Sequence, residues 1–475
     1  MAIKIDDSLT PKTLLPKITR LFELSAGKIL SLEKTFGPAE SAPVFTAKGK
    51  YTPHGWTDWT QGFQFGSALL QFDATGEKRF LELGRARTMQ SMASHVSNIG
   101  GHDHGFNNIS TYGNLWRLMR EGKIPYQENE QAFYELALKV SGAVQAARWT
   151  RIANGKGFIY SFNGAHSLFI DTLRSLRSLA VAHQLGHVLM GERGQRICLL
   201  QRLIEHAETT AQWNIYYGEG RDSYDERGRT AHESIFNAND GHYRCPNSQQ
   251  GFSPFSTWTR GLAWAMLGFS EQLEFIEEAG ALAPSIGEIS TVKAPPTRTS
   301  LLPMLSLLRK AAEATSEFYL KNTCADGVPM WDTGAPNLPR LGSFLDKAAN
   351  PYNAWEPVDS SAAAIAAQGL LRLGKFLLGG PHHTKGARYR QAGLTIASTL
   401  FSEPYLSTDT EHQGLLLHAV YHRPNGWDYI APGQKVPNGE SAMWGDYHVR
   451  ELALLLLREA QGGNHLKFFD SSRSP

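Results

Sequence analysis

The pattern that decides the fold lies in residues 57–95, TDWTQGFQFGSALLQFDATGEKRFLELGRARTMQSMASH. Residues 57–72 and 77–95 each carry apolar side chains at helical spacing, and Ala74-Thr75-Gly76 lies between them. The segment therefore predicts two helices joined by a short turn, which is a helical hairpin.

Similar apolar stripes recur within residues 173–180, 264–276, 365–371 and 452–456. A further helix is expected to start at Thr10-Pro11, with Thr10 as the N-cap and proline at the first helical position. Alternating runs of Val, Ile and Thr are almost absent, so we expect few strands. The chain is predicted to be all-α, a toroid of helical hairpins in a single domain over residues 1–475.

Gly, Pro and Asn gather in five segments, which we interpret as loops: 99–109, 237–256, 280–299, 323–341 and 421–445. Long loops on one side of a helical toroid are where function usually resides. The 280–299 segment holds Pro284, Pro295 and Pro296 and lies between two similar helical patterns. It is expected to be a flexible insertion rather than a domain boundary.

Composition excludes several classes of protein. The 475 residues carry a net charge of +2 without a clustered basic face, so no nucleic-acid partner is expected. Cys198, Cys245 and Cys324 are too few and too scattered for a disulfide framework or a CxxC metal site. The N-terminus lacks a signal-peptide core, and no stretch approaches the ~20 apolar residues of a membrane span. We expect a cytoplasmic protein with no membrane partner, no metal and no other cofactor.

Polar and aromatic residues concentrate in or beside the loops. They form five clusters: residues 56–63 (WTDWTQGF), residues 102–106 (HDHGF), Phe162-Asn163 with Ile170-Asp171, a run from His232 through Asp240-Gly241 and Gln250-Gly251 to residues 258–264 (WTRGLAW), and residues 444–447 (WGDY). Sugar sites need flat apolar surfaces, fixed polar groups and carboxyls that exchange protons. A guanidinium beside tryptophan also suits an acidic sugar, because it can hold a carboxylate in a bidentate fork.

The two carboxyls of these clusters each have a structural alternative. Asp103 follows a Gly-Gly-His turn and can serve as a helix cap. Asp171 precedes a strongly apolar helix, where a carboxylate is stabilised by the helix dipole.

The aromatic and histidine residues have alternatives as well. His232 taken alone fits a structural histidine, and Trp258 and Trp264 lie six residues apart, so one of them can be core. The triplet at 102–104 is poor evidence for a metal site, because adjacent side chains point in different directions along a loop.

Taken in order, the clusters resemble the unsaturated glucuronyl hydrolases, glycoside hydrolase family eighty-eight, and the related unsaturated rhamnogalacturonyl hydrolases. The resemblance is colinear from about residue 56 to residue 457. The matching motifs are Trp59-Thr60-x-Gly62-Phe63, His102-Asp103-x-Gly105-Phe106, Ile170-Asp171, His232, Asp240-Gly241, Gln250-Gly251, Trp258-x-Arg260-Gly261-x-Ala263-Trp264, Asp359-Ser360-Ser361-Ala362 and Trp444-Gly445-Asp446-Tyr447.

The resemblance implies an (α/α)6 barrel of six inner and six outer helices, with the site at one mouth. It implies a substrate ending in the 4-deoxy-hex-4-enuronic acid that polysaccharide lyases leave at a new non-reducing end. The family hydrates the C4=C5 vinyl ether of this sugar, and the resulting hemiketal opens and expels the remaining sugar. An acidic oligosaccharide is therefore the expected partner.

The resemblance also implies residue roles. Asp171 takes the acid/base position, and burial with a nearby like charge is expected to raise its pKa. Asp103 would hold the substrate and tune Asp171. The other matching positions are substrate-binding: Trp59, His102, Phe162, His232, Gln250, Trp258, Arg260 and Trp264.

This sequence departs from the family pattern at three places. Phe162 stands where the family often has tryptophan, and the 104–130 and 280–299 segments are atypical. The leaving sugar, its sulfation and the oligomeric state are not predicted. Two alternatives stay open: a glycosidase acting on saturated glucuronides through the same aspartate pair, and a non-catalytic toroid that binds acidic sugars.

Overall fold

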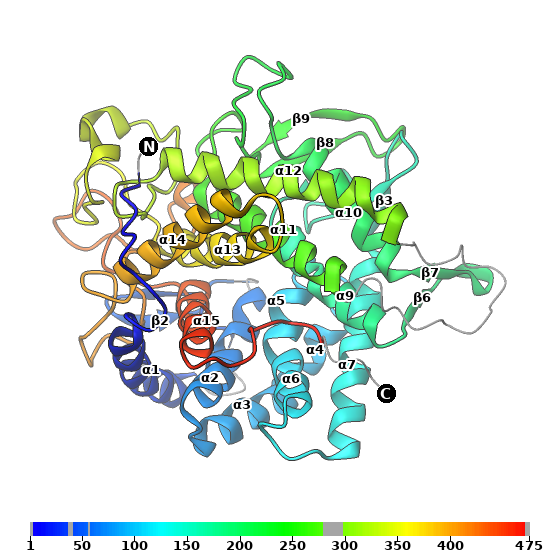
Figure 1. The fold of residues 1–475 in the computed structure, drawn as a ribbon, viewed down its shortest axis with the longest axis horizontal. Helices are drawn as coiled ribbons and strands as arrows, with labels where there is room; N and C mark the ends of the chain where they lie inside the picture. Colours follow the sequence, from blue (N-terminus) through cyan, green and yellow to red (C-terminus); the bar gives the residue numbers. More distant parts are fainter. Residues whose placement is uncertain (1–2, 37–40, 56–57, 279–297, 471–475) are drawn as a thin grey trace.

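The computed structural model describes residues 3–36, 41–55, 58–278 and 298–470. Within these ranges the helices form two concentric layers (Figure 1). The inner layer consists of α2 (Gln61–Thr75), α5 (His104–Asn108) continued through a π-helical turn by α6 (Asn114–Arg120), α8 (Thr172–Ser175) with α9 (Arg177–Gln184), α11 (Thr259–Glu278), α13 (Ser360–Leu378) and α15 (Met443–Ala460). The outer layer consists of α1 (Leu15–Thr35), α3 (Lys78–Ser91), α7 (Glu128–Ala147), α10 (Leu199–Trp213), α12 (Arg298–Asn322) and α14 (His383–Leu400), and α4 (Ala93–Val96) is a short connecting turn.

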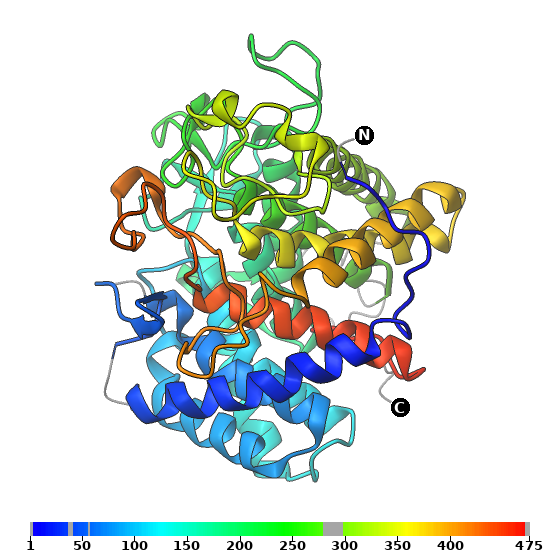
Figure 2. The same cartoon turned by 90° about the vertical axis from the view of Figure 1, so that its left-hand side faces the viewer.

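The inner layer is a closed ring. Helix α2 contacts α5, α5 contacts α8, α8 contacts α11, α11 contacts α13, α13 contacts α15, and α15 returns to α2. Figure 1 shows α15 beside α2, and Figure 2 shows α1 running along α15 although the two belong to opposite ends of the sequence. The predicted all-α (α/α)6 barrel is confirmed.

Burial separates the two layers, because inner helices are covered on both sides and outer helices on one. In α3 the buried positions are Phe80, Gly84 and Thr88, a single stripe, whereas α13 is buried almost all round. Among the described helices, α13 alone is long and apolar enough to meet the criteria for a membrane span. Of its most apolar window, 83% is buried inside the protein, as expected for a core helix.

Short antiparallel strands lie in the loops between the helices. They are β1 (Phe45–Ala47), β2 (Lys50–Thr52), β3 (Trp149–Arg151), β4 (Gly157–Ile159), β5 (Ser167–Phe169), β6 (Val188–Met190), β7 (Arg196–Cys198), β8 (Glu233–Phe236) and β9 (Tyr243–Asn247). Strands β5, β8 and β9 form a three-stranded sheet with Phe169 opposite Glu233. The amide of Ile170 donates to the carbonyl of His232 at 3.0 Å, so this sheet holds the residues before Asp171 against His232.

The hairpin predicted over residues 57–95 is present as α2 and α3, and α2 ends at Gly76 with a left-handed φ of 73°. One predicted helix start and one predicted loop were wrong. Helix α1 begins at Leu15 rather than after Thr10, which keeps Pro16 in the first turn, where no backbone N–H is needed. Residues 104–108 of the predicted 99–109 loop are helix α5. The predicted insertion at 280–299 lies outside the described residues, except that residues 298 and 299 belong to α12.

Candidate active site

A cavity of about 210 Å³ opens at the loop end of the inner ring. Its lining comprises Trp59, His102, Asp103, Phe106, Phe162, Asp171, Gln249, Gln250, Trp258, Arg260, Trp264, Tyr421, His422, Asn425 and Trp427. Every predicted site residue except His232 is in this set. The volume is below the roughly 300–1,000 Å³ typical of sites for drug-sized ligands, so the cavity suits one sugar ring rather than a long chain.

Two aspartates flank one histidine in the cavity. Asp103 directly precedes α5 and Asp171 directly precedes α8. The Nε2 atom of His102 lies 3.3 Å from Oδ1 of Asp171 and 3.9 Å from Oδ1 of Asp103. Neither aspartate side chain makes a capping hydrogen bond to its helix. The helix-cap alternative therefore does not account for these carboxyls.

Close backbone packing brings the two aspartates together. A Cβ atom on Gly105 would lie 2.3 Å from the carbonyl oxygen of Ser175, so α5 and α8 approach as only glycine permits. The amide of Gly105 also donates to Oγ of Ser175 at 2.8 Å. Asp103 and Asp171 each lie within a few residues of this contact.

The imidazole of His102 is fixed and buried. Its ring stacks on Phe162 at 5.9 Å and meets the edge of Phe169 at 5.5 Å. Its side chain is 2% exposed, whereas those of Asp103 and Asp171 are 21% and 13% exposed. The two carboxylates are therefore partly open to the cavity, and the imidazole that lies against both of them is buried.

Electrostatics treats the two carboxyls differently. Burial raises the pKa of Asp103, and the charge of Asp171 adds to this, against the opposing effect of His102. Burial would also raise the pKa of Asp171, but the hydrogen bond with His102 and the charges of His102 and His232 outweigh it and lower that pKa. The expectation that Asp171 would have the raised pKa was wrong for the free protein, because His102 lies closer to Asp171.

The protonated form of His102 is favoured by the same two carboxylates. Burial lowers the pKa of this imidazole, but Asp103 and the hydrogen bond with Asp171 more than compensate, so the pKa is raised. Because His102 lies between two carboxylates, the protonation of each of the three groups depends on that of the others.

His232 lies behind the cavity wall rather than in it. Its Nδ1 accepts the amide N–H groups of Gln249 at 3.0 Å and Gln250 at 3.4 Å. Burial lowers its pKa to about 4, so the ring is neutral at pH 7 and its proton sits on Nε2. This Nε2 is buried and has no hydrogen-bond partner within the described chain. His232 thus positions the segment that carries Gln250.

Arg260 is engaged by protein acceptors. Its guanidinium is 1% exposed and pairs with Asp359 at 3.1 Å. It also donates to the carbonyl oxygens of Val420 and Tyr421 and to Oε1 of Gln250. The bidentate fork predicted for a substrate carboxylate is therefore already occupied. Because Gln250 uses Oε1 as an acceptor, its amide N–H groups are what it offers to the cavity.

Aromatic rings form the rest of the wall. Trp59 stacks on Trp444 with centroids 5.0 Å apart, and Phe106 packs on Trp264 at 4.9 Å. Trp258 and Trp264 are both buried and both line the cavity, although they are six residues apart. Phe162 is 40% exposed. Flat apolar surfaces of this kind accept pyranose faces.

The C-terminal motifs hold the wall from behind. Trp444 donates from Nε1 to Oγ of Ser361 at 2.9 Å. Asp446 accepts the amide N–H groups of Leu415 and Leu416 at 2.9 and 2.8 Å. Both motifs therefore support the cavity wall without lining it.

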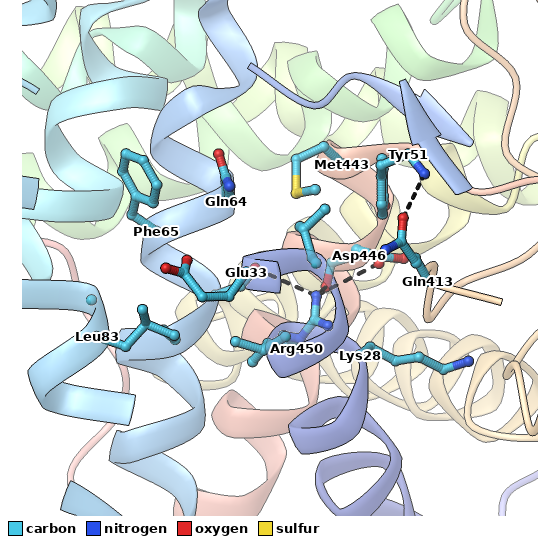
Figure 3. Close-up of a pocket in the computed structure, with 15 residues that line it drawn as sticks. Lys28, Glu33, Tyr51, Gln64, Phe65, Leu83, Gln413, Met443, Asp446 and Arg450 are labelled. Atoms are coloured by element: carbon cyan, nitrogen blue, oxygen red, sulfur yellow. Dashed lines mark hydrogen bonds and ion pairs between the residues drawn. The ribbon is translucent and has the colours of Figure 1, made fainter. Parts of the chain in front are cut away.

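A second hollow, around Asp446, is too small for a sugar. Figure 3 shows Arg450 turned toward Asp446, with Lys28 and Tyr51 nearby. The space measures about 20 Å³, which is room for about one water molecule. The buried charges there serve packing between α1, α2 and α15.

Sequence reasoning gave no site role to six lining residues: Phe106, which it named only within a motif, and Gln249, Tyr421, His422, Asn425 and Trp427. The last four belong to the predicted 421–445 loop, of which only Trp444 and Gly445 were singled out. The carboxylate of Asp428 accepts the amide N–H groups of Tyr421 and His422 and so fixes this loop. A tyrosine, a histidine and a tryptophan close together in a Gly/Pro/Asn-rich loop were the available signal.

No protein-family model matches the chain. Curated relatives, however, match most of its length. The unsaturated glucuronyl hydrolase of Bacillus sp. (strain GL1) is 26% identical over 430 residues, covering 88% of this chain and 91% of the relative. The unsaturated chondroitin disaccharide hydrolase of Streptococcus pyogenes serotype M1 is 23% identical, with 85% and 82% covered.

Solved structures agree in fold. The Bacillus sp. GL1 unsaturated glucuronyl hydrolase superposes with a TM-score of 0.69 at 22% identity, covering 96% of this chain and 100% of that one. One from Streptococcus agalactiae, complexed with dGlcA-GalNAc6S, gives a TM-score of 0.62 at 18% identity, with 98% of each chain covered. These comparisons support the unsaturated glucuronyl hydrolase family. The chain is a glycoside hydrolase, and the cavity lies where the family's motifs converge.

Proposed function

We propose that this protein releases the terminal 4,5-unsaturated uronic acid from acidic oligosaccharides made by polysaccharide lyases. The observation that carries the proposal is His102 lying between Asp103 and Asp171 in a ring-sized aromatic cavity. A vinyl ether reacts after protonation, so the site needs a carboxyl that holds a proton and returns it.

In the proposed reaction a proton held by the group of Asp103, His102 and Asp171 passes from His102 to Asp171 and from there to C4, and water adds to the electron-poor C5. The water proton returns to Asp171, which leaves a hemiketal at C5. Opening of the hemiketal breaks the C5–O5 bond and leaves a ketone at C5 and a hemiacetal at C1. Collapse of this hemiacetal to the aldehyde breaks the bond to the remaining sugar, which leaves as an alcohol. The raised pKa of Asp103 supports this cycle, because it keeps a proton within the group at higher pH than an isolated aspartate would.

The substrate would lie between the aromatic walls, with Trp59, Trp258, Trp264 and Phe162 against its ring. Phe162 supplies a flat face in place of the tryptophan common in the family, but it has no N–H donor. Amide N–H groups of Gln250 would recognise the acidic sugar, and His232 would hold the segment that carries them. Arg260 would act by holding Gln250 in place.

We further propose that residues 1–475 act as one catalytic domain in the cytoplasm, without a nucleic-acid or membrane partner. One hydrophobic cluster runs through helices from α1 to α15, which supports a single domain. The non-catalytic alternative is set aside, because the relatives are hydrolases and both carboxyls are present.

The test is a panel of lyase-generated disaccharides and saturated glucuronides. Hydration removes the C4=C5 double bond, so turnover of an unsaturated substrate abolishes its ultraviolet absorbance. We expect this loss with release of the second sugar. Turnover of saturated glucuronides with no loss of absorbance from unsaturated ones would favour the two-carboxylate alternative.

A further inference from the structure

Arg148, the residue that ends α7, lies buried behind the cavity with its guanidinium fully engaged. The residue is 6% exposed. Its Nε donates to the carbonyl oxygen of Tyr160 at 3.2 Å, its Nη2 to that of Ser161 at 2.8 Å, and its Nη1 to that of Ile99. Each of the three guanidinium nitrogens therefore holds a different main-chain carbonyl.

The carbonyls that Arg148 holds belong to the two segments that carry much of the site. One is the segment 99–103, which ends in the aspartate beside α5, and the other is the segment 160–162. The two segments meet again at the cavity, where the ring of Phe162 stacks on that of His102 at 5.9 Å. Arg148 does not line the cavity, so it joins the same two segments from behind.

Two further residues of α7 hold the first of these segments. Nε2 of Gln145 donates to the carbonyl oxygen of His102 at 2.9 Å, and Oγ of Ser141 lies 3.0 Å from Nδ1 of His104. Gln145 and Ser141 are completely buried, and with Arg148 they recur at the spacing of one helix face. The inward face of an outer helix is ordinarily apolar, so this polar stripe is an exception that fixes the segment before α5.

Arg148 also brings a positive charge, which is fixed at every pH at which the enzyme is folded. Burial raises the pKa of Asp103, and the charges of His102 and Arg148 act against it. Burial and the charge of Arg148 lower the pKa of His102, against the two aspartates, which raise it. Without this charge, the aspartate–histidine group (Asp103, His102 and Asp171) would keep its protons to higher pH.

Other titratable side chains that act on the aspartate–histidine group are neutral near pH 7. Burial shifts their pKa values: to about 4 for His104 in α5, about 3 for His206 in α10, about 4 for His232 in β8 and about 12 for Tyr421 in the loop before α15. Arg260 of α11 is charged, but Asp359 lies 3.1 Å from it. Arg148 is therefore a charge that stays constant while the group titrates.

We propose that Arg148 is a positioning residue for the hydration reaction, which sets how the segments 99–103 and 160–162 face each other and keeps a fixed positive charge beside the aspartate–histidine group. The inference rests on the proposed function, because it assigns Arg148 to the same reaction. Arg148 acts through Asp103, His102 and Phe162 rather than on the substrate.

The test uses the variants R148K, R148Q and R148M. Lysine keeps the charge, but its compact ammonium cannot replace the planar fork that holds three carbonyls. Glutamine and methionine remove the charge as well, and the two are made in parallel so that one folded variant is sufficient. The matched control is R151Q, which removes an exposed cation from the neighbouring strand β3. Thermal melts establish that each variant is folded at the assay temperature.

We expect kcat on an unsaturated disaccharide to fall at least about tenfold in all three Arg148 variants, each measured at its own pH optimum, because the site groups lose their mutual placement. Both limbs of the profile of kcat/KM against pH should move to higher pH in R148Q and R148M, because the aspartate–histidine group then keeps its protons longer. The limbs should stay in place in R148K and R151Q.

Three results overturn the proposal. The first is wild-type kcat in folded R148Q or R148M. The second is a lowered kcat with unmoved limbs in these two variants, which makes Arg148 a purely structural residue. The third is an equal movement of the limbs in R148K, which removes the charge as their cause.

Titration of His102 separates this proposal from the proposed function. Magnetic resonance of protein with labelled histidine follows the ring, and the signal is assigned by its loss in His102→Gln. If the wild type turns over no unsaturated sugar, the proposed function fails, and the titration still decides on Arg148. A midpoint that rises in R148Q and R148M but not in R148K supports its role, and equal midpoints in all variants overturn it.

Discussion

The Nε2 atom of His102 lies 3.3 Å from Oδ1 of Asp171 and 3.9 Å from Oδ1 of Asp103. This bridge sets the pKa of Asp171 below its ordinary value, while burial and the charge of Asp171 raise the pKa of Asp103. The nearer carboxylate is stabilised as the anion and the farther one is pushed toward the acid. Protons of the three groups therefore titrate as a set.

Asp171→Asn should lower kcat by about 10²–10⁴-fold, since Asn cannot carry the catalytic proton. The fold should persist, because the Asp171 side chain makes no capping bond to α8. Initial rates on an unsaturated disaccharide and a thermal melt measure both effects. The exposed change Asp7→Asn is the control, and full activity in Asp171→Asn would remove this residue from the chemistry.

Asp103→Asn should stabilise the fold at neutral pH while it lowers activity. The folded pKa of Asp103 is raised above its ordinary value of 3.8, so the folded state binds more protons than the unfolded one in the window above that value. Wild-type stability from this group is therefore present below pH 3.8 and falls as pH rises through the folded pKa. Denaturant unfolding at several pH values should show the variant's gain grow with pH. A variant less stable than wild type at pH 7 contradicts the raised pKa.

Arg260→Ala should cost about 3–5 kcal/mol of unfolding free energy, because it leaves Asp359 buried without its partner. It should also raise KM, since Gln250 loses the donor that holds it. Adding Asp359→Asn should recover part of the stability, because asparagine still caps α13. A raised KM with no loss of stability would indicate that Arg260 binds substrate directly.

Gly105→Ala should destabilise the protein by about 1–3 kcal/mol and reduce activity, because its Cβ meets the backbone of Ser175. Gly27→Ala in α1 is the matched control. A Cβ there meets nothing within 4 Å, so this change should stabilise by about 0.5–1 kcal/mol. Equal melting temperatures for the two variants would mean that α5 and α8 can separate at no cost.

The sequence was sufficient for the barrel and for most of the cavity lining. Apolar helical spacing and motif order depend on local chemistry, so α2, α3 and residues such as Trp59 and Asp171 were predictable. The pKa order of Asp103 and Asp171 was not, because it depends on a separation of a few tenths of an ångström from His102. The occupation of Arg260 by carbonyl oxygens of residues 420 and 421 was equally hidden, since nothing in its own motif points to a loop 160 residues away.

Helix α15 completes the inner ring by packing between α13 and α2. During synthesis, α2 leaves the ribosome some 380 residues before its neighbour α15, so its apolar face stays uncovered for nearly the whole of translation. Pairings this distant in sequence slow folding and leave partly folded chains prone to aggregation. We expect nascent chains released before residue 443 to be held by chaperones or degraded, which makes the last inner helix a quality checkpoint as well as a wall of the site.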